Sequence, residues 1–281
     1  MRCCSKEMQN SEARGFTNRL VSNILEPISV HMETTQENPV LEARIQEMVD
    51  AGVFYGCNKS KTNPKVKNLV FGNRGGIELI DLTKTADAMD EALAFLTKIR
   101  EAGGTFLIVG TQPAAQEAVK NFMDKFGFPG VLRRWLGGLL TNFRSLLGRK
   151  DHFVKLRSDF EAKAFEHLKK KERLEIERDI ARMDELFGGI QKMSDLPKAL
   201  IIIDPHLHVT AVREARLMKI PVVAFGDTMS DPDMVNYLVL GNTKSKTSIN
   251  WFVEKVSEAL ANAKVSVPSV PELSVPELPK A

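Results

Sequence analysis

Three short, uninterrupted apolar segments constrain the fold of this chain more than any other feature. They are Thr105–Val109, Ala199–Ile203 and Val222–Phe225, and each is rich in β-branched residues. Helical patterns at Pro113–Phe126 and Val209–Met218 come between them. A continuous apolar strand, without polar alternation, is typical of a sheet covered on both faces. The sequence therefore predicts an α/β fold with a parallel central sheet.

The region before these strands predicts a β-hairpin followed by a helix. Leu69–Phe71 and Ile77–Leu82 are strand candidates, and Gly72–Gly76 between them has the composition of a hairpin turn. A helical pattern then begins near Thr83, a capping residue type, and ends at Gly103. We assign residues 39–141 and 190–263 to one α/β domain.

A long charged stretch, residues 142–189, interrupts the domain. It has no proline, and its apolar residues recur at steps of three and four: Ile176, Ile180, Met183, Phe187 and Ile190. That spacing is a heptad seam. A single helix of this length would span roughly 70 Å, whereas folding back would bury both halves of the seam. We predict an inserted antiparallel coiled-coil hairpin that turns within residues 158–171.

Both ends of the chain lack core-forming patterns. Residues 1–38 predict a flexible extension; an organelle-targeting segment is the alternative, although such segments are usually poor in acids and this one contains several. Residues 264–281 repeat Val-Pro and Pro-Glu-Leu, which predicts a disordered Pro-rich tail, with a docking motif as the alternative.

Cysteine usage and hydropathy exclude two classes of protein. The three cysteines, at positions 3, 4 and 57, have no framework spacing, which argues against a secreted disulfide scaffold and favours a reducing cytoplasm. No apolar run approaches the roughly 18 residues that a membrane-spanning helix needs, so we expect no membrane partner.

Polar residues after two of the predicted strands are the candidates for a metal site or a catalytic site. The carboxyl ends of parallel strands converge, so these residues could hold a divalent ion: Asp204, His206, His208, Asp227 and Asp231. Equally, the aspartates could be turn formers and caps. With Thr111 at another strand end, three of them (Asp204, His206 and Asp227) could form a phosphate-binding enzyme site. The glycine-rich phosphate loops of nucleotide-binding enzymes are absent. We therefore predict no enzyme, no cofactor and no firm metal site.

The stronger signal is for nucleic acid. The net charge is only +3, yet three segments combine cations with no acid: Asn58–Asn68, Gly72–Gly76 and Leu132–Gly138. Cations and amides contact phosphates, and arginine and tryptophan stack on bases. The candidate RNA-binding residues are Lys59, Lys61, Asn63, Lys65, Lys67, Arg74, Arg133, Arg134, Trp135, Asn142 and Arg144. We expect them to converge on one face; the alternative is a set of solvated loops with Trp135 in the core.

Several of these segments also carry a family resemblance. Arg134–Asn142 reads Arg-Trp-Leu-Gly-Gly-Leu-Leu-Thr-Asn. Asn63–Lys67 before it, and Asp227–Pro232 and Gly241-Asn242 after it, occur in the expected order. Over roughly residues 45 to 260, the chain resembles the bacterial-type small-subunit ribosomal protein two family. Phe54 and Cys57 depart from it, since many members have histidine there.

The resemblance implies a flavodoxin-like α/β sandwich with an inserted helical hairpin. It also implies a structural constituent of the small subunit of cytoplasmic ribosomes, which contacts ribosomal RNA and neighbouring proteins, including the mRNA-binding protein S-one. No small-molecule substrate is expected. The alternatives are an α/β enzyme that binds a phosphorylated ligand and a coiled-coil adaptor acting through residues 142–189.

Overall fold

The computed structural model describes residues 39–162, 164–165, 169–191 and 193–263. The predicted N-terminal extension and Pro-rich tail lie outside these residues. By its internal contacts the chain divides into two units, Met1–Ala43 and Arg44–Ala281. Of the first unit, only the start of helix α2 (Pro39–Asp50) is described.

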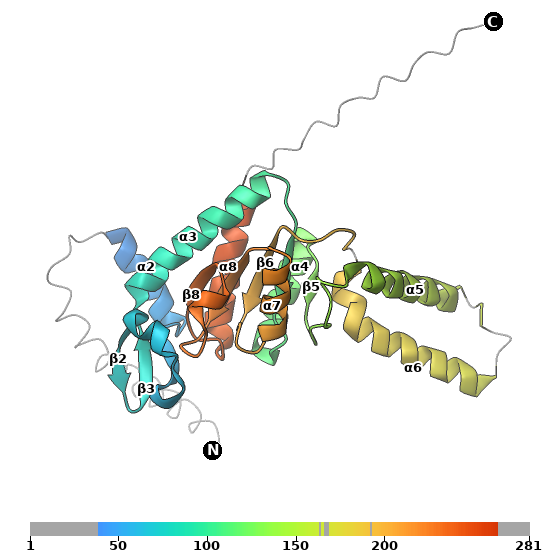
Figure 1. The fold of residues 1–281 in the computed structure, drawn as a ribbon, viewed down its shortest axis with the longest axis horizontal. Coiled ribbons are helices and arrows are strands. Elements are labelled where there is room, and N and C mark those ends of the chain that lie inside the picture. The colour runs from blue at the N-terminus through green and yellow to red at the C-terminus, as the bar shows by residue number, and fades with distance from the viewer. Residues whose placement is uncertain (1–38, 163, 166–168, 192, 264–281) are drawn as a thin grey trace, which may run out of the picture. The chain divides into compact units, whose positions relative to one another are not determined.

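The second unit is built on a five-stranded parallel sheet (Figure 1). Its strands are β4 (Phe106–Val109), β5 (Gly130–Val131), β6 (Ala199–Ile203), β7 (Val222–Gly226) and β8 (Tyr237–Leu240). They lie in the order β5-β4-β6-β7-β8, and each neighbouring pair is parallel. Counted along the chain this is the order 2-1-3-4-5 of flavodoxin-like sheets. The predicted parallel sheet is confirmed; β5, of two residues, and β8 were not foreseen.

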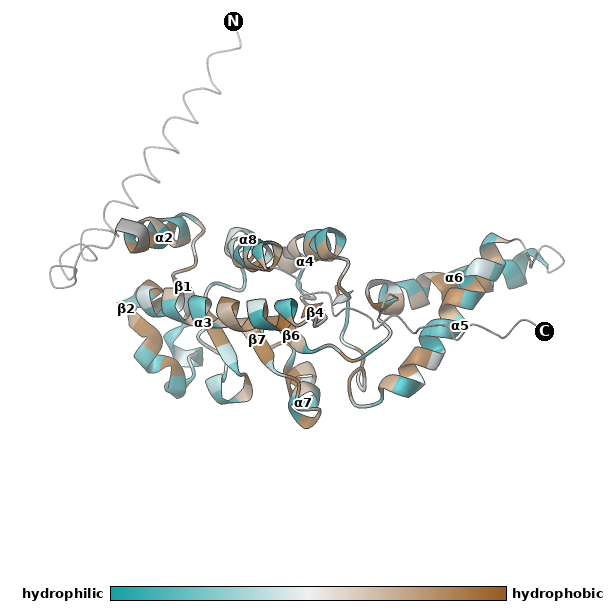
Figure 2. Cartoon of the chain, turned by 90° about the horizontal axis from the view of Figure 1, so that it is seen from above, coloured by the Kyte–Doolittle hydropathy of each residue, from teal (hydrophilic) through white to brown (hydrophobic). Residues whose placement is uncertain are grey.

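Helices cover both faces of this sheet because its strands are apolar on both sides. Helices α4 (Pro113–Phe126) and α8 (Lys246–Asn262) lie on one side, and α7 (Val209–Leu217) lies on the other (Figure 2). On the α7 side, alternate strand residues share a core cluster with the helix: Leu107, Val109, Leu200, Ile202, Val222, Ala224, Ala211, Val212 and Ala215. On the other side, the ring of Phe225 stacks on Phe252 of α8, with 4.7 Å between centroids.

A second, antiparallel sheet precedes α3 (Leu82–Glu101). It has the order β1-β3-β2, from β1 (Tyr55–Asn58), β2 (Val70–Arg74) and β3 (Ile77–Ile80). Gly75 and Gly76 both have positive φ in the β2–β3 turn, as the predicted hairpin required. Between β1 and β2 lie two short 3-10 helices, η1 (Lys59–Lys61) and η2 (Pro64–Leu69). Val66 and Ile80 pack on Leu240, which joins this sheet to β8.

Two helices occupy the charged region between β5 and β6: α5 (Phe143–Glu161) and α6 (Lys170–Phe187), with η3 (Gly188–Ile190) following directly. Arg157 Nη1 lies 3.2 Å from Asp184 Oδ1, and the rings of Phe153 and Phe187 stack. In these two contacts the later residue of α5 pairs with the earlier residue of α6, so the two helices run antiparallel (Figure 1). Phe153 and Phe187 also belong to the core cluster of the α7 side.

Candidate nucleic-acid interface

The first basic segment is anchored on the loop that follows β7. The backbone N–H of Asn63 donates to the Thr228 carbonyl (2.9 Å), and its side-chain amide donates to the Ser230 carbonyl (3.3 Å). The Asn63 side-chain oxygen also accepts from the N–H of Lys65, which caps η2. Asn63 therefore positions the segment. From the sequence we had predicted it to be an RNA-binding residue.

The lysines of this segment differ in their surroundings. Lys65 Nζ pairs with Asp231, 3.1 Å away, and with Asp233. These bonds, first to Asp233 and then to Asp231, raise the pKa of Lys65, and they offset its charge. The other three are exposed and, among the described residues, form no ion pair: Lys59, Lys61 and Lys67. Arg74 is exposed on β2, opposite Ile77 of β3.

The loop after β5 presents Arg133 and Arg134 as exposed side chains. Trp135 beside them is half-buried and packs on the core of the α7 side. Its indole N–H donates to Glu214 of α7 (3.0 Å). Trp135 is thus a half-buried residue that packs on the core and holds the loop.

Glu214 organises the rest of this loop. The residue is 7% exposed, and its carboxylate also accepts from the backbone N–H groups of Gly138 (2.8 Å), Leu140 (3.0 Å) and Thr141 (3.5 Å). A buried carboxylate is stable only when such donors satisfy it. Sequence reasoning missed Glu214, although a signal was present: it falls on the apolar face of α7, between Val212 and Ala215.

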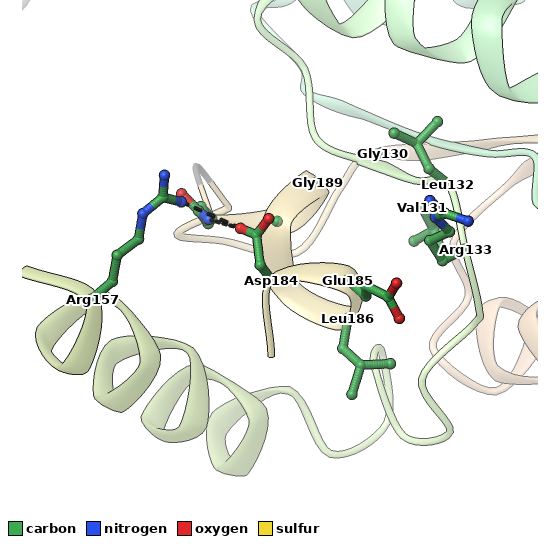
Figure 3. Close-up of a pocket in the computed structure, with 11 residues that line it drawn as sticks. Gly130, Val131, Leu132, Arg133, Arg157, Asp184, Glu185, Leu186 and Gly189 are labelled. Carbon is green, nitrogen blue, oxygen red and sulfur yellow. Dashed lines mark hydrogen bonds and ion pairs between the residues drawn. The ribbon is translucent and has the colours of Figure 1, made fainter. Parts of the chain in front are cut away.

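Arg133 also faces the α5–α6 pair across a pocket of about 420 Å³. Figure 3 shows Arg157 reaching Asp184 at one side of this pocket and Arg133 at the other. Asn142 caps the start of α5 without a side-chain hydrogen bond, and Arg144 lies in its first turn; both are exposed. These groups extend the basic surface from the loop onto α5.

From the sequence we expected the basic segments to converge on one face. In the structure they do not meet in one local patch. Arg74 lies on β2 of the antiparallel sheet and Lys61 in η1 between β1 and β2, and this sheet packs beside β8. Arg133 follows β5 at the opposite edge of the five-stranded sheet. Four strand spacings separate these edges, about 19 Å at 4.8 Å each. The basic residues therefore form two clusters, one around Lys61 and Arg74 and one around Arg133. Helix α7 lies over the strands between them.

Asp204 serves as a turn former. Its φ is +63°, and its Oδ1 accepts from the N–H groups of His206 (3.1 Å) and Leu207 (3.4 Å). Its Oδ2 accepts from Gln112 (2.7 Å) and Thr243 (3.4 Å). The carboxylate is fully used by protein donors, which agrees with the non-metal interpretation of this residue.

The other metal candidates have separate partners. Asp227 accepts a hydrogen bond from the thiol of Cys57 (2.8 Å), which lies 3.3 Å from Lys244 Nζ; burial and Asp227 raise the pKa of this thiol. Asp231 pairs with Lys65. Across the described part of the chain, no group of three or more His, Cys, Asp or Glu side chains is arranged to hold a metal ion.

The two histidines also differ in environment. His206 is exposed. His208 is buried, with Nε2 3.4 Å from Thr111 Oγ1, and burial lowers its pKa despite the opposing charge of Asp204. Of the residues considered for an enzyme site, Asp204 and Asp227 each bond to protein groups. Thr111 lies beside His208, and His206 is exposed. No described helix is long and apolar enough to cross a membrane.

Comparison with known proteins gives the family. The model of the ribosomal protein S2 family matches residues 48–263. The small ribosomal subunit protein uS2 of Deinococcus radiodurans is 38% identical over 220 residues, covering 78% of this chain and 83% of that protein. The uS2 protein of Thermus thermophilus is 34% identical over 227 residues, covering 81% of this chain and 89% of that protein. With this match extending over the α/β fold and both basic clusters, the chain belongs to the ribosomal protein S2 family.

Proposed function

We propose that this protein is a structural constituent of the small ribosomal subunit and acts without catalytic turnover. Family membership supports the ribosomal role. The observation that carries the mechanism is the loop after β5, where Glu214 and Trp135 fix the backbone while Arg133 and Arg134 remain exposed. A rigid loop with exposed guanidinium groups can bind phosphates with little loss of conformational entropy.

The RNA-binding groups divide by role. The exposed cations and polar groups that neutralise or contact phosphates are Lys59, Lys61, Lys67, Arg74, Arg133, Arg134, Asn142 and Arg144. Asn63 and Trp135 position their segments, and Lys65 contributes less because two carboxylates already pair with it. The partner is small-subunit ribosomal RNA within a cytoplasmic ribosome.

We further propose that α5 and α6 form an inserted antiparallel coiled-coil hairpin, residues 142–189, used as an interface for RNA or for neighbouring ribosomal proteins, among them the mRNA-binding protein S-one. The Arg157–Asp184 pair and the Phe153–Phe187 stack support this arrangement. Deleting residues 158–182, which keeps the core residues Phe153 and Phe187, should shorten the hairpin while the α/β domain, residues 39–141 and 190–263, still folds. Loss of cooperative unfolding in that variant would contradict the domain division.

Co-sedimentation with small ribosomal subunits tests the proposed function. The wild-type protein should sediment with subunits from which the endogenous S2-family protein has been removed. The variant Arg133→Ala/Arg134→Ala should be lost from that fraction, while Lys120→Ala/Lys125→Ala, with the same charge change on exposed positions of α4, should be retained. Normal incorporation of the arginine variant would contradict the assignment of the loop.

The salt dependence of binding gives an independent test. Each cation that neutralises a phosphate contributes roughly 0.7 to 0.9 to the slope of log affinity against log salt. With six contacts, affinity for small-subunit ribosomal RNA should fall by about a thousandfold between 50 and 200 mM salt. An affinity independent of salt would exclude phosphate neutralisation as the mechanism. An enzyme of the alternative class would instead be stabilised by sugar phosphates or nucleotides.

A further inference from the structure

The outward face of α7 carries cations and no acid. The helix buries Ala211, Val212, Ala215 and its only acid, Glu214, which is bonded to the Trp135 loop. Arg213, Arg216 and, just after the helix, Lys219 are exposed. In the described residues none of these three cations forms an ion pair. The inward turn of Glu214 thus leaves the outward face of the helix itself without an acid.

Helix α7 contacts both basic clusters. Through Glu214 it holds the loop that presents Arg133 and Arg134. Toward the other cluster, Arg216 Nη1 lies 3.8 Å from Met234 Sδ in η4 (Pro232–Met234), and its charge lowers the pKa of Asp231, after the larger effect of Lys65. The helix therefore fills the interval between two surfaces that are each proposed to bind RNA.

Lys219 supplies a second, independent observation. Its φ is +56°, in the left-handed region that disfavours side chains and favours glycine at a helix end. The chain places a lysine there although glycine would fit the backbone better. Backbone strain of this kind clusters at functional sites, and an exposed lysine supplies positive charge there.

We propose that the outward face of α7, formed by Arg213, Arg216 and Lys219, binds the phosphate backbone of ribosomal RNA and joins the two basic clusters into one continuous surface. The inference rests on the proposed function and adds helix α7, which belongs to neither basic cluster, to the RNA-binding surface. An RNA backbone fits better than a protein because this face of α7 presents three cations and no acid, and both neighbouring clusters carry exposed cations. Asp231, which feels the charge of Arg216, is already paired with Lys65. Exposed Leu207 and Leu217, at 57% and 75%, border the surface without neutralising it.

Binding of a small-subunit ribosomal RNA transcript from the source organism tests this inference. The variants are Arg213→Ala/Arg216→Ala on α7, Arg133→Ala/Arg134→Ala on the loop and Lys120→Ala/Lys125→Ala on α4 as the charge-matched control. The α7 variant should bind roughly tenfold more weakly at 100 mM salt, and its salt slope should fall by about 1.4 to 1.8, because two phosphate contacts are lost. The α4 variant should match the wild type.

The results separate the inference from the proposed function. If the loop variant weakens binding and the α7 variant does not, the α7 inference is overturned and the proposed function stands. If neither weakens binding, the proposed function fails as well. If the α7 variant binds the transcript normally but no longer enters subunits depleted of the S2-family protein, the face contacts a protein, which also overturns the inference.

Lys219→Gly tests whether weaker RNA binding results from the lost charge or from misfolding. Glycine removes the charge and relieves the positive φ, so the variant should bind RNA more weakly while unfolding at the same or a higher denaturant concentration. Unchanged binding by this variant would remove Lys219 from the proposed surface.

Discussion

The indole N–H of Trp135 donates to the buried carboxylate of Glu214 across 3.0 Å, and this bond ties the arginine loop to α7. Two residues 79 positions apart are thereby linked at the centre of the candidate interface. Trp135 and Glu214 have no direct role in neutralising phosphate. In the proposed function, their effect is to hold Arg133 and Arg134 in one position before RNA binds.

Replacing Glu214 should unfold this part of the molecule. Glu214→Ala removes the acceptor for the indole and for two close backbone N–H groups, and these donors, one buried and two part-buried, would be left unsatisfied. We expect a loss of about 3 kcal/mol or more in the free energy of unfolding, since each unsatisfied buried group costs roughly 1 to 3 kcal/mol. Urea titration followed by circular dichroism measures it.

Trp135→Phe is the matched milder change, because it keeps an aromatic ring and removes one donor. It should cost about 1 to 2 kcal/mol. A Glu214→Ala variant as stable as the wild type would show that the loop is not held by this carboxylate. Because Trp135 packs in the core, a test of RNA binding should change Arg133 and Arg134 and leave Trp135 in place.

Much of the fold follows from local pattern. The three continuous apolar strands indicated a parallel sheet because only a two-sided burial makes such segments stable, and β4, β6 and β7 lie where the pattern placed them. Strand β5 has two residues, too few for any periodicity. It exists because β4 offers it a partner, which is a tertiary effect.

The site was less accessible to sequence reasoning. Charge composition located the basic segments, but it carries no information about pairing, so the neutralisation of Lys65 by Asp231 and Asp233, over 160 residues away, could not be foreseen. Nor could pattern alone reveal that Arg74 lies on a sheet beside β8, whereas Arg133 follows β5 at the opposite edge of the five-stranded sheet. Glu214 could have been identified from the sequence, because it is an acid on the apolar face of a predicted helix.

Gly189 should tolerate no side chain. A Cβ at this position would lie 2.0 Å from the carbonyl oxygen of Gly130, so η3 packs backbone to backbone on β5. Gly189→Ala must displace η3 or the sheet edge, and we expect a loss of about 2 to 4 kcal/mol in the free energy of unfolding, in the range of overpacking and backbone strain. Chemical denaturation provides the measurement.

The control for Gly189 is Gly148→Ala. Gly148 lies inside α5, and a Cβ there would meet nothing within 4 Å. Alanine favours a helix over glycine by about 0.5 to 1 kcal/mol, so this variant should be more stable than the wild type. Equal effects of the two substitutions would contradict the close approach of η3 to β5.

Lys61 and Lys65 should differ in their contribution to RNA binding although they are four residues apart. Lys61→Ala removes an exposed cation without an ion pair among the described residues, and the salt slope should fall by about 0.7 to 0.9. Lys65→Ala should change the slope less, because Lys65 must first give up Asp231 and Asp233. Filter binding of small-subunit ribosomal RNA across a salt series measures both.

The reverse change sharpens this comparison. Asp231→Asn/Asp233→Asn frees Lys65 and removes two negative charges, so it should strengthen RNA binding and make it more dependent on salt. The asparagine at position 231 can still accept the N–H of residue 233, which preserves the cap of η4. Weaker binding by the double variant would mean that these carboxylates themselves contribute to the interface.

His208 should make the fold sensitive to acid. Burial lowers its pKa in the folded state below the ordinary value of 6.5, so below that pH the unfolded chain binds a proton that the folded chain does not. Stability from the neutral imidazole is therefore complete above pH 6.5 and is lost as pH falls, by at most about 1.4 kcal/mol per pH unit for one proton. His208→Gln should show a smaller fall in unfolding free energy between pH 7 and 5.5 than the wild type.

His206→Gln is the control, since that side chain is exposed and meets solvent whether or not the chain is folded. If the acid sensitivity of His208→Gln equals that of the wild type, the proton is taken up elsewhere, and the packing of His208 against Thr111 is not what links folding to pH.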